Sequence, residues 1–342
     1  MEASVQTVDV RQLRHRVGQW VRAASNVHRP GGEPDVLLFS TPRGGSTWLF
    51  ELIGTQSGFK SCDEPLNLRN ANVSPALGIS DWPDLYDESR VLSICDYFQS
   101  LHQGKLSHMN RNLWDANHRV LTHRVVYKVL HGAEYMAPTL AQSIGARVVV
   151  LLRHPIPVGL SRTVLPRLDA ILQSSAREQY TAEGVREMAR IAAKGSPLER
   201  SVLAWCLQTA PLLNARQPEW AVVTYEQLVV DTSPVIQHLA EVLALPDPDE
   251  MFARINRPSA SIRGMSTLAT QRVLAQRATR ERSLWLVQKW RDDVSIEEER
   301  AAMAILGLFE IDAYQFGSVF PADSLWVDLR TYSEHRGNGE GT

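Results

Sequence analysis

The sequence predicts an α/β fold in a single domain, with a central, mostly parallel sheet flanked by helices. Three observations predict it. Short β-branched and aliphatic runs alternate with segments of helical periodicity. A glycine-rich loop joins the first of these runs directly to a helix. No proline- or glycine-rich linker divides the chain of 342 residues, so we expect one domain rather than two.

The composition is that of a globular protein, with 44% hydrophobic and 22% charged residues, and it excludes a disordered chain, a collagen and a coiled coil. The longest aliphatic run, residues 148–152, is far shorter than the ~20 apolar residues of a membrane-spanning helix. The first 20 residues lack the apolar core of a secretory signal, and the three cysteines form no CxxC pair, so we expect a cytoplasmic protein. A net charge of −2 argues against nucleic-acid binding.

The first predicted elements surround a break in the chain. An amphipathic helix over residues 10–24 precedes the break at residues 28–34, and a second helix runs from Ser46 to Ile53. Four runs rich in valine and leucine are expected to be strands: residues 36–39, 124–130, 147–152 and 221–225.

Capping residues mark two later helices. Ser233 is expected to cap a helix with Pro234 at its first position. Ser295 and Glu298 form the pattern of a capping box before a helix over residues 302–309. We divide the chain into an N-terminal helical extension, residues 1–33, a main domain, residues 34–330, and a flexible tail, residues 331–342.

The loop over residues 41–48, TPRGGSTW, is the most informative segment. A glycine-rich turn that enters a helix presents backbone N–H groups at the positive end of the helix dipole, which suits a phosphate or a sulfate. Arg43 adds a fixed charge. An ordinary turn with a solvated Arg43 is the alternative. The order strand, glycine-rich loop, helix makes the predicted sheet P-loop-like. The loop is not a Walker A motif, because Gly45 stands where that motif has its lysine, and the sequence has no dinucleotide-binding fingerprint.

These residues resemble the family of PAPS-dependent sulfotransferases, where PAPS is 3′-phosphoadenosine-5′-phosphosulfate. The segment from Pro42 to Trp48 is similar to the family's 5′-phosphosulfate loop, and its Arg43 is typical of bacterial and carbohydrate-acting members. The family's second signature is an arginine at a strand end with a serine eight residues later, and Arg153 and Ser161 have this spacing. The resemblance implies that both bind the 3′-phosphate. The alternative for Arg153 is a salt bridge at the end of a strand, and the alternative for Ser161 is a hydroxyl on a helix surface.

Later segments extend the resemblance over residues 36–314. It implies that Tyr225 lies near the adenine and that Trp48 stacks on it, with core packing as the alternative for both. It also implies that Arg257 and Ser259 belong to a loop that closes over the 3′-phosphate. The resemblance therefore implies the following PAPS-binding residues: Arg43, Gly44, Gly45, Ser46, Thr47, Trp48, Arg153, Ser161, Tyr225, Arg257 and Ser259.

By the same resemblance, the protein moves a sulfuryl group from PAPS to a hydroxyl, in preference to an amine, and releases PAP without using a metal. Two residues compete for the general base. Glu64 is preferred because Glu-Pro segments occur in bacterial and carbohydrate-acting members, and His131 is the rival because histidine side chains in general titrate near neutral pH. The alternative for Glu64 is an acidic residue in a turn without a catalytic role, and the alternative for His131 is a surface histidine at the end of a strand. Lys128 is assigned to the sulfuryl oxygens and Arg43 to the bridging oxygen.

The expected partner is a small-molecule or carbohydrate acceptor, with no nucleic acid and no membrane span; a homodimer stays open. The polar segment over residues 162–197, which contains Arg167 and Arg177, is expected to be a mobile acceptor lid. Two other functions are weighed. A P-loop kinase or phosphotransferase lacks support without the Walker lysine, and a non-catalytic PAP-binding protein fits poorly with intact Arg43, Arg153 and Ser161.

Overall fold

A computed structural model describes residues 17–18, 20–21, 24–111, 114–115, 118–162, 165–257 and 280–328. Ser259, the tail over residues 331–342 and most of the helix predicted over residues 10–24 lie outside these ranges. Of that helix, residues 17–18, 20–21 and 24 are described and are helical. None of the described helices is long and apolar enough to cross a membrane.

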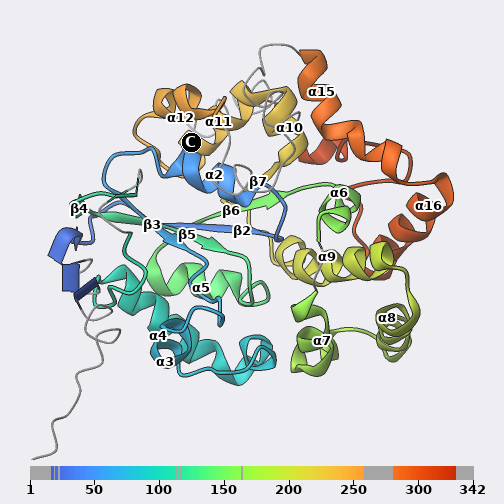
Figure 1. The fold of residues 1–342 in the computed structure, drawn as a ribbon, viewed down its shortest axis with the longest axis horizontal. Coiled ribbons are helices and arrows are strands. Elements are labelled where there is room, and N and C mark those ends of the chain that lie inside the picture. Colours follow the sequence, from blue (N-terminus) through green and yellow to red (C-terminus); the bar gives the residue numbers. More distant parts are fainter. Residues whose placement is uncertain are drawn as a thin grey trace, which may run out of the picture.

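The five strands of the central sheet are all parallel, in the order β3, β5, β2, β6, β7 (Figure 1). Their bounds are β3 Phe59–Asp63, β5 Arg124–Val129, β2 Val36–Ser40, β6 Arg147–Leu152 and β7 Ala221–Thr224. A separate parallel pair joins β1 Val27–His28 to β4 Leu121–Thr122. The prediction of an α/β fold with a central parallel sheet flanked by helices is confirmed.

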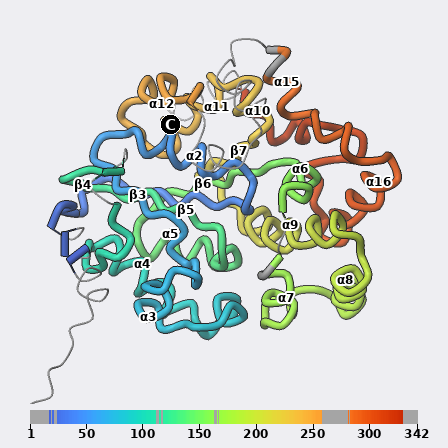
Figure 2. Tube along the Cα trace, viewed as in Figure 1, coloured from blue at the N-terminus to red at the C-terminus, as the bar shows by residue number. Residues whose placement is uncertain are grey.

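Helices cover both faces of this sheet, since each strand is buried on both sides (Figure 1). The α-helices are α2 Ser46–Ile53, α3 Val73–Leu77, α4 Val91–His102, α5 Ala137–Ile144, α6 Pro155–Leu160, α7 Pro166–Gln173, α8 Ala182–Lys194, α9 Pro197–Asn214, α10 Tyr225–Val230, α11 Thr232–Val242, α12 Pro248–Arg254, α15 Arg280–Gln288 and α16 Ile296–Ala304. Short 3₁₀ segments are η1 Pro83–Tyr86, η2 Glu88–Arg90, η3 Ser175–Gln179, η4 Lys289–Asp293, η5 Ile305–Phe309 and η6 Asp323–Leu325. Figure 2 shows that the C-terminal helix α16 lies beside α6 and α9.

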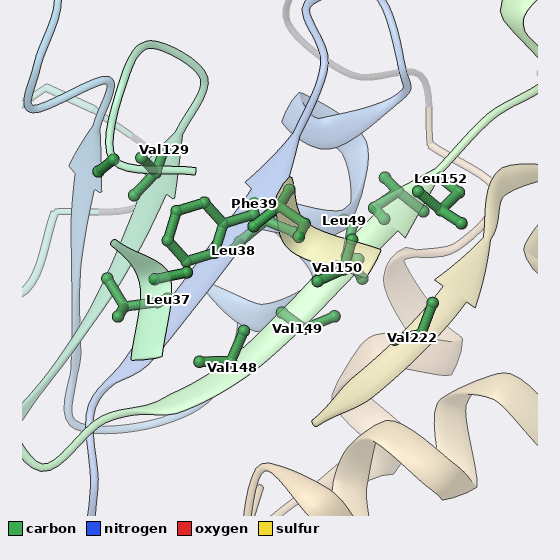
Figure 3. Packing of buried hydrophobic residues seen from close by; sticks show 14 of the residues in the cluster. Leu37, Leu38, Phe39, Leu49, Val129, Val148, Val149, Val150, Leu152 and Val222 are labelled. Atoms are coloured by element: carbon green, nitrogen blue, oxygen red, sulfur yellow. The ribbon is translucent and has the colours of Figure 1, made fainter. Parts of the chain in front are cut away.

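The centre of the core lies between β2 and β6. Phe39 on β2 is fully buried and pairs in register with Val129 of β5 and Val150 of β6. Figure 3 shows Leu49 of α2 packed near these strands, which holds the helix over the sheet. Dense aliphatic packing of this kind fixes the ends of the strands and therefore the loops that follow them.

Most of the predicted elements are found, although the short strands β1 and β4 were not predicted. Three other outcomes bear on the prediction. The strand β3 was not predicted, because its sequence FKSCD has no aliphatic run and only its edge position next to β5 makes it a strand. The helix expected to be capped by Ser233 begins at Thr232, with Asp231 in the cap position, so that prediction is wrong. The capping box of Ser295 is confirmed, but its helix ends at Ala304 and continues as the 3₁₀ segment η5.

Candidate active site

The loop between β2 and α2 requires glycine at both of its central positions. Gly45 has a φ of 91°, and a Cβ there would lie 2.5 Å from Cδ2 of Tyr225. A Cβ on Gly44 would lie 2.5 Å from Oγ of Ser40. The first N–H groups of a helix have no partner within it, and among the described residues no side chain caps α2. A loop of this geometry suits an anion, and the anion-binding role of the loop stays a prediction.

Arg153 joins the two signature segments. It directly follows β6, and its Nη1 donates to the carbonyl oxygen of Arg43 at 2.9 Å. Its guanidinium carbon lies 4.3 Å above the ring of Tyr225. Its Nε is buried and has no hydrogen-bond partner in the described part of the chain. The residue after β6, the first residue of α10 and the loop after β2 thus meet at the carboxyl ends of the strands. The guanidinium group of Arg153 at their centre can still donate a hydrogen bond from Nε.

A buried network lies behind Arg153, and the sequence analysis did not identify it. The backbone N–H of His154 donates to Oε1 of Glu226 at 2.9 Å, and the hydroxyl of Tyr314 donates to Oε2 at 2.8 Å. Burial lowers the pKa of His154 to about 3 and raises the pKa of Glu226. These contacts fix the backbone next to Arg153. The position of Glu226, directly after Tyr225, was the available signal.

Lys128 connects the glycine-rich loop to a pair of carboxylates. Its Nζ lies 3.2 Å from Oγ1 of Thr47, 2.6 Å from Oδ1 of Asp63 and 3.3 Å from Oε1 of Glu64. The side chain is only 4% exposed. Parallel pairing of β3 with β5 sets Asp63 opposite Lys128, which explains the short contact. Asp63 was missed because β3 was not predicted.

Glu64 and His131, the two rival bases, are hydrogen-bonded to each other. Nε2 of His131 lies 3.1 Å from Oε2 of Glu64, and Nδ2 of Asn67 donates to the same oxygen at 2.8 Å. Glu64 has a left-handed backbone with a φ of 51°, and its N–H donates to the carbonyl oxygen of Lys128 at 3.0 Å. Nδ1 of His131 is buried without a partner among the described residues. The two residues therefore form one hydrogen-bonded unit.

Other predicted residues are less directly placed. The hydroxyl of Ser161 donates to the carbonyl oxygen of Val158 at 2.9 Å, a common bond for a serine within a helical turn. Trp48 is 5% exposed and packs edge-on against Tyr225, with 6.0 Å between ring centroids, as expected for a core aromatic pair. Arg257 is exposed after α12. The PAPS-binding roles of these residues stay predictions.

The expected lid over residues 162–197 is more ordered than a polar loop. Its described part contains α7, η3 and α8. Arg167 on α7 is 5% exposed and donates to the carbonyl oxygen of Leu130 at 3.1 Å. Arg177 is exposed and donates to the carbonyl oxygen of Leu172 at 3.3 Å. Of these two arginines, Arg177 has the surface position that a lid residue would have, whereas Arg167 is buried because α7 packs against η1 and α9.

No cluster of three or more metal-ligating side chains occurs within the ranges that the structure describes. Comparison with protein families gives a match to the sulfotransferase domain over residues 33–305. The chain belongs to this sulfotransferase family. The match covers the glycine-rich loop, Glu64, Lys128, His131 and Arg153.

Solved sulfotransferase structures are similar to this sulfotransferase at low identity. The sulfotransferase domain from the curacin biosynthetic pathway is 18% identical, covers 67% of this chain and 78% of its own, and has a TM-score of 0.35. The sulfotransferase domain from the Synechococcus PCC 7002 olefin synthase is 16% identical, with coverages of 84% and 98% and a TM-score of 0.43. Mouse sulfotransferase SULT7A1, complexed with PAP, is 14% identical, with coverages of 86% and 93% and a TM-score of 0.38. No curated protein matches this chain.

Proposed function

We propose that this sulfotransferase moves the sulfuryl group of PAPS to a hydroxyl group of a small-molecule or carbohydrate acceptor, in preference to an amine. One observation carries the proposal. The two anion-binding segments are joined by the Arg153–Arg43 hydrogen bond, and the Glu64–His131 pair is joined to the same loop through Lys128 and Thr47. The site for the sulfuryl donor and the proton-accepting pair therefore lie together at the carboxyl ends of the parallel strands, where parallel sheets bind their ligands.

The residues present fit a phosphosulfate nucleotide. The N–H groups at the start of α2 would hold the 5′-phosphosulfate, and the buried Nε of Arg153, which has no partner in the described part of the chain, would donate to the 3′-phosphate. When bound, PAPS supplies the sulfuryl group and leaves as PAP. Arg43 and Lys128 provide fixed positive charge, so the proposal requires no metal to stabilise the developing negative charge.

Proton transfer falls to the Glu64–His131 pair. We propose that Glu64 accepts the proton of the acceptor hydroxyl. Two groups orient its carboxylate, Nδ2 of Asn67 and Nε2 of His131. In the alternative arrangement, the same hydrogen bond from Nε2 of His131 to Glu64 orients the imidazole. The proton acceptor is then Nδ1 of His131, which has no partner among the described residues, as in a histidine oriented by a carboxylate. Kinetics of the two single variants distinguish these arrangements.

We also propose that the protein works in the cytoplasm. The three cysteines, Cys62, Cys95 and Cys206, are all buried and free, which supports a reducing environment such as the cytoplasm. The proposal leaves the N-terminal extension without a role.

Calorimetric titration of the full chain with PAP, ADP and AMP, with and without EDTA, tests the donor site. We expect PAP to bind most tightly and EDTA to leave its affinity unchanged, because the 3′-phosphate contact is made by Arg153. Equal affinities for PAP and AMP would contradict the proposal. Transfer of ³⁵S from labelled PAPS to a panel of hydroxylated metabolites then tests turnover, and binding without any transfer would favour a non-catalytic PAP-binding protein.

A further inference from the structure

Beyond the Glu64–His131 pair, a second group of polar side chains is buried at the end of β5. Buried polar atoms in folded proteins almost always have hydrogen-bond partners. In the described part of the chain, four atoms of this group have none: Oε2 of Glu134, Nη1 of Arg162, Nε of Arg167 and Oε1 of Gln208. These atoms are available to a hydrogen-bonding group that the described residues do not supply.

The carbonyl oxygen of Leu130, directly before His131, brings several of these side chains together. It accepts from Nη1 of Arg167 at 3.1 Å and from Nε2 of Gln208 at 3.3 Å. The same Nε2 lies 3.2 Å from Oε1 of Glu134. Helices α7 and α9 therefore converge on the residue next to the proposed proton-accepting pair.

The hydroxyl of Tyr86 marks the middle of the group. It accepts from the N–H of Gly132 at 3.3 Å. Burial raises the pKa of this hydroxyl, and the charges of Glu134, Arg167 and Arg162 also act on that pKa, so all three side chains lie within electrostatic range of the hydroxyl. We call Tyr86, Glu134, Arg162, Arg167 and Gln208 the arginine cluster.

Trp82 links the arginine cluster to the reacting groups. Its ring centroid lies 5.5 Å from that of His131, and the guanidinium carbon of Arg167 lies 6.0 Å from the Trp82 ring. The negative charge of Glu64 also acts on the pKa of Arg167. A ligand held by the cluster would therefore lie beside the Glu64–His131 pair.

The charge of the cluster is positive. Neither Arg162 nor Arg167 forms a salt bridge with another described residue. Burial raises the pKa of Glu134 to about 8 and lowers the pKa of Arg162 to about 10, so at neutral pH the carboxyl is largely uncharged while the guanidinium stays charged. A buried cation without a counterion is costly, and a bound anion would remove that cost.

We propose that the arginine cluster binds a carboxylate of the acceptor, beside the hydroxyl that receives the sulfuryl group, so that the acceptors are hydroxy carboxylic acids. The inference rests on the proposed function and names its substrate class. A guanidinium fork matches the two oxygens of a carboxylate. The hydroxyl of Tyr86 and the protonated carboxyl of Glu134 can donate to the same singly charged group, whereas a phosphate would bring a second negative charge to a buried site.

The test is calorimetric titration of the full chain, saturated with PAP, with matched pairs of probes. The pairs are 4-hydroxyphenylacetate with 4-hydroxyphenylacetamide and 3-hydroxybutyrate with 3-hydroxybutyramide, and glycerol 3-phosphate is the phosphate probe. In at least one pair we expect the acid to bind on the order of 10- to 100-fold more tightly than the amide, as hydrogen bonds to charged groups allow. Arg162→Gln should abolish the difference, and Arg177→Gln, an exposed arginine of the same segment, should preserve it.

Because Arg167 also holds the carbonyl of Leu130, its variant is the conservative Arg167→Lys, and Arg162→Gln keeps the test valid if that variant fails to fold. Three results would overturn the inference: no preference for the acid in either pair, a preference that survives both substitutions, or tighter binding of glycerol 3-phosphate through the same arginines. The titrations are repeated without PAP. Failure of PAP to bind overturns the proposed function, whereas the carboxylate preference is still measured on the PAP-free chain.

Discussion

Replacing Arg153 by alanine tests the donor site most directly. The substitution removes the hydrogen bond from Nη1 to the carbonyl oxygen of Arg43 at 2.9 Å and the stacking on Tyr225 at 4.3 Å. The side chain is partly exposed, so solvent weakens both contacts, and we expect the free energy of unfolding to fall by only about 1 kcal/mol.

The effect on binding should be much larger than the effect on folding. Truncating one partner of a charge-assisted contact costs about 2–5 kcal/mol, so PAP affinity should fall by roughly 30- to 5,000-fold. AMP, which has no 3′-phosphate, should lose far less. Isothermal titration with both nucleotides measures the difference, and urea unfolding measures stability.

Arg177→Ala is the matched control, since Arg177 is exposed and donates only to the carbonyl of Leu172 among the described bonds. Equal losses for PAP and AMP would show that Arg153 does not bind the 3′-phosphate. Global unfolding of the variant would show that the residue is structural, and the function inferred from its position would then lose its main support.

Three further predictions concern the base, the loop and a buried acid. Glu64→Gln should lower kcat by about 10²–10⁴-fold with PAP binding intact, while His131→Ala mainly raises the acceptor KM; the reverse pattern in steady-state kinetics would make His131 the base. Gly45→Ala should destabilise the protein in urea unfolding by more than Gly78→Ala, which has a similar positive φ but no atom within 4 Å of an added Cβ; equal losses would show that the clash is relieved. The folded-state pKa of Glu134 is raised to about 8, so the folded chain keeps a proton that the unfolded chain releases, and stability should fall by up to about 1.4 kcal/mol per pH unit between pH 5 and pH 8. Glu134→Gln should flatten this slope, and an unchanged slope in pH-dependent unfolding would refute the assignment.

Local sequence patterns were sufficient for most of the fold. The valine-rich runs of β5, β6 and β7 predicted strands because β-branched residues favour a buried sheet, and the loop before α2 was recognised from its two glycines. The capping box at Ser295 was found because its two partners are three residues apart. In each case the signal that predicts the element lies within a few residues of the chain.

The candidate site depended on contacts that no local pattern encodes. Glu64 and His131 are 67 residues apart, and local patterns predict them only as rival bases. In the structure, the pairing of β3 with β5 brings them into hydrogen-bond contact. That pairing also brings Asp63 to Lys128, although β3 itself has no strong strand signal. The sequence by itself determined which residues can bind an anion or accept a proton. Only the tertiary structure decided which of them meet, because the order of strands in a parallel sheet is set by packing between segments far apart in the chain.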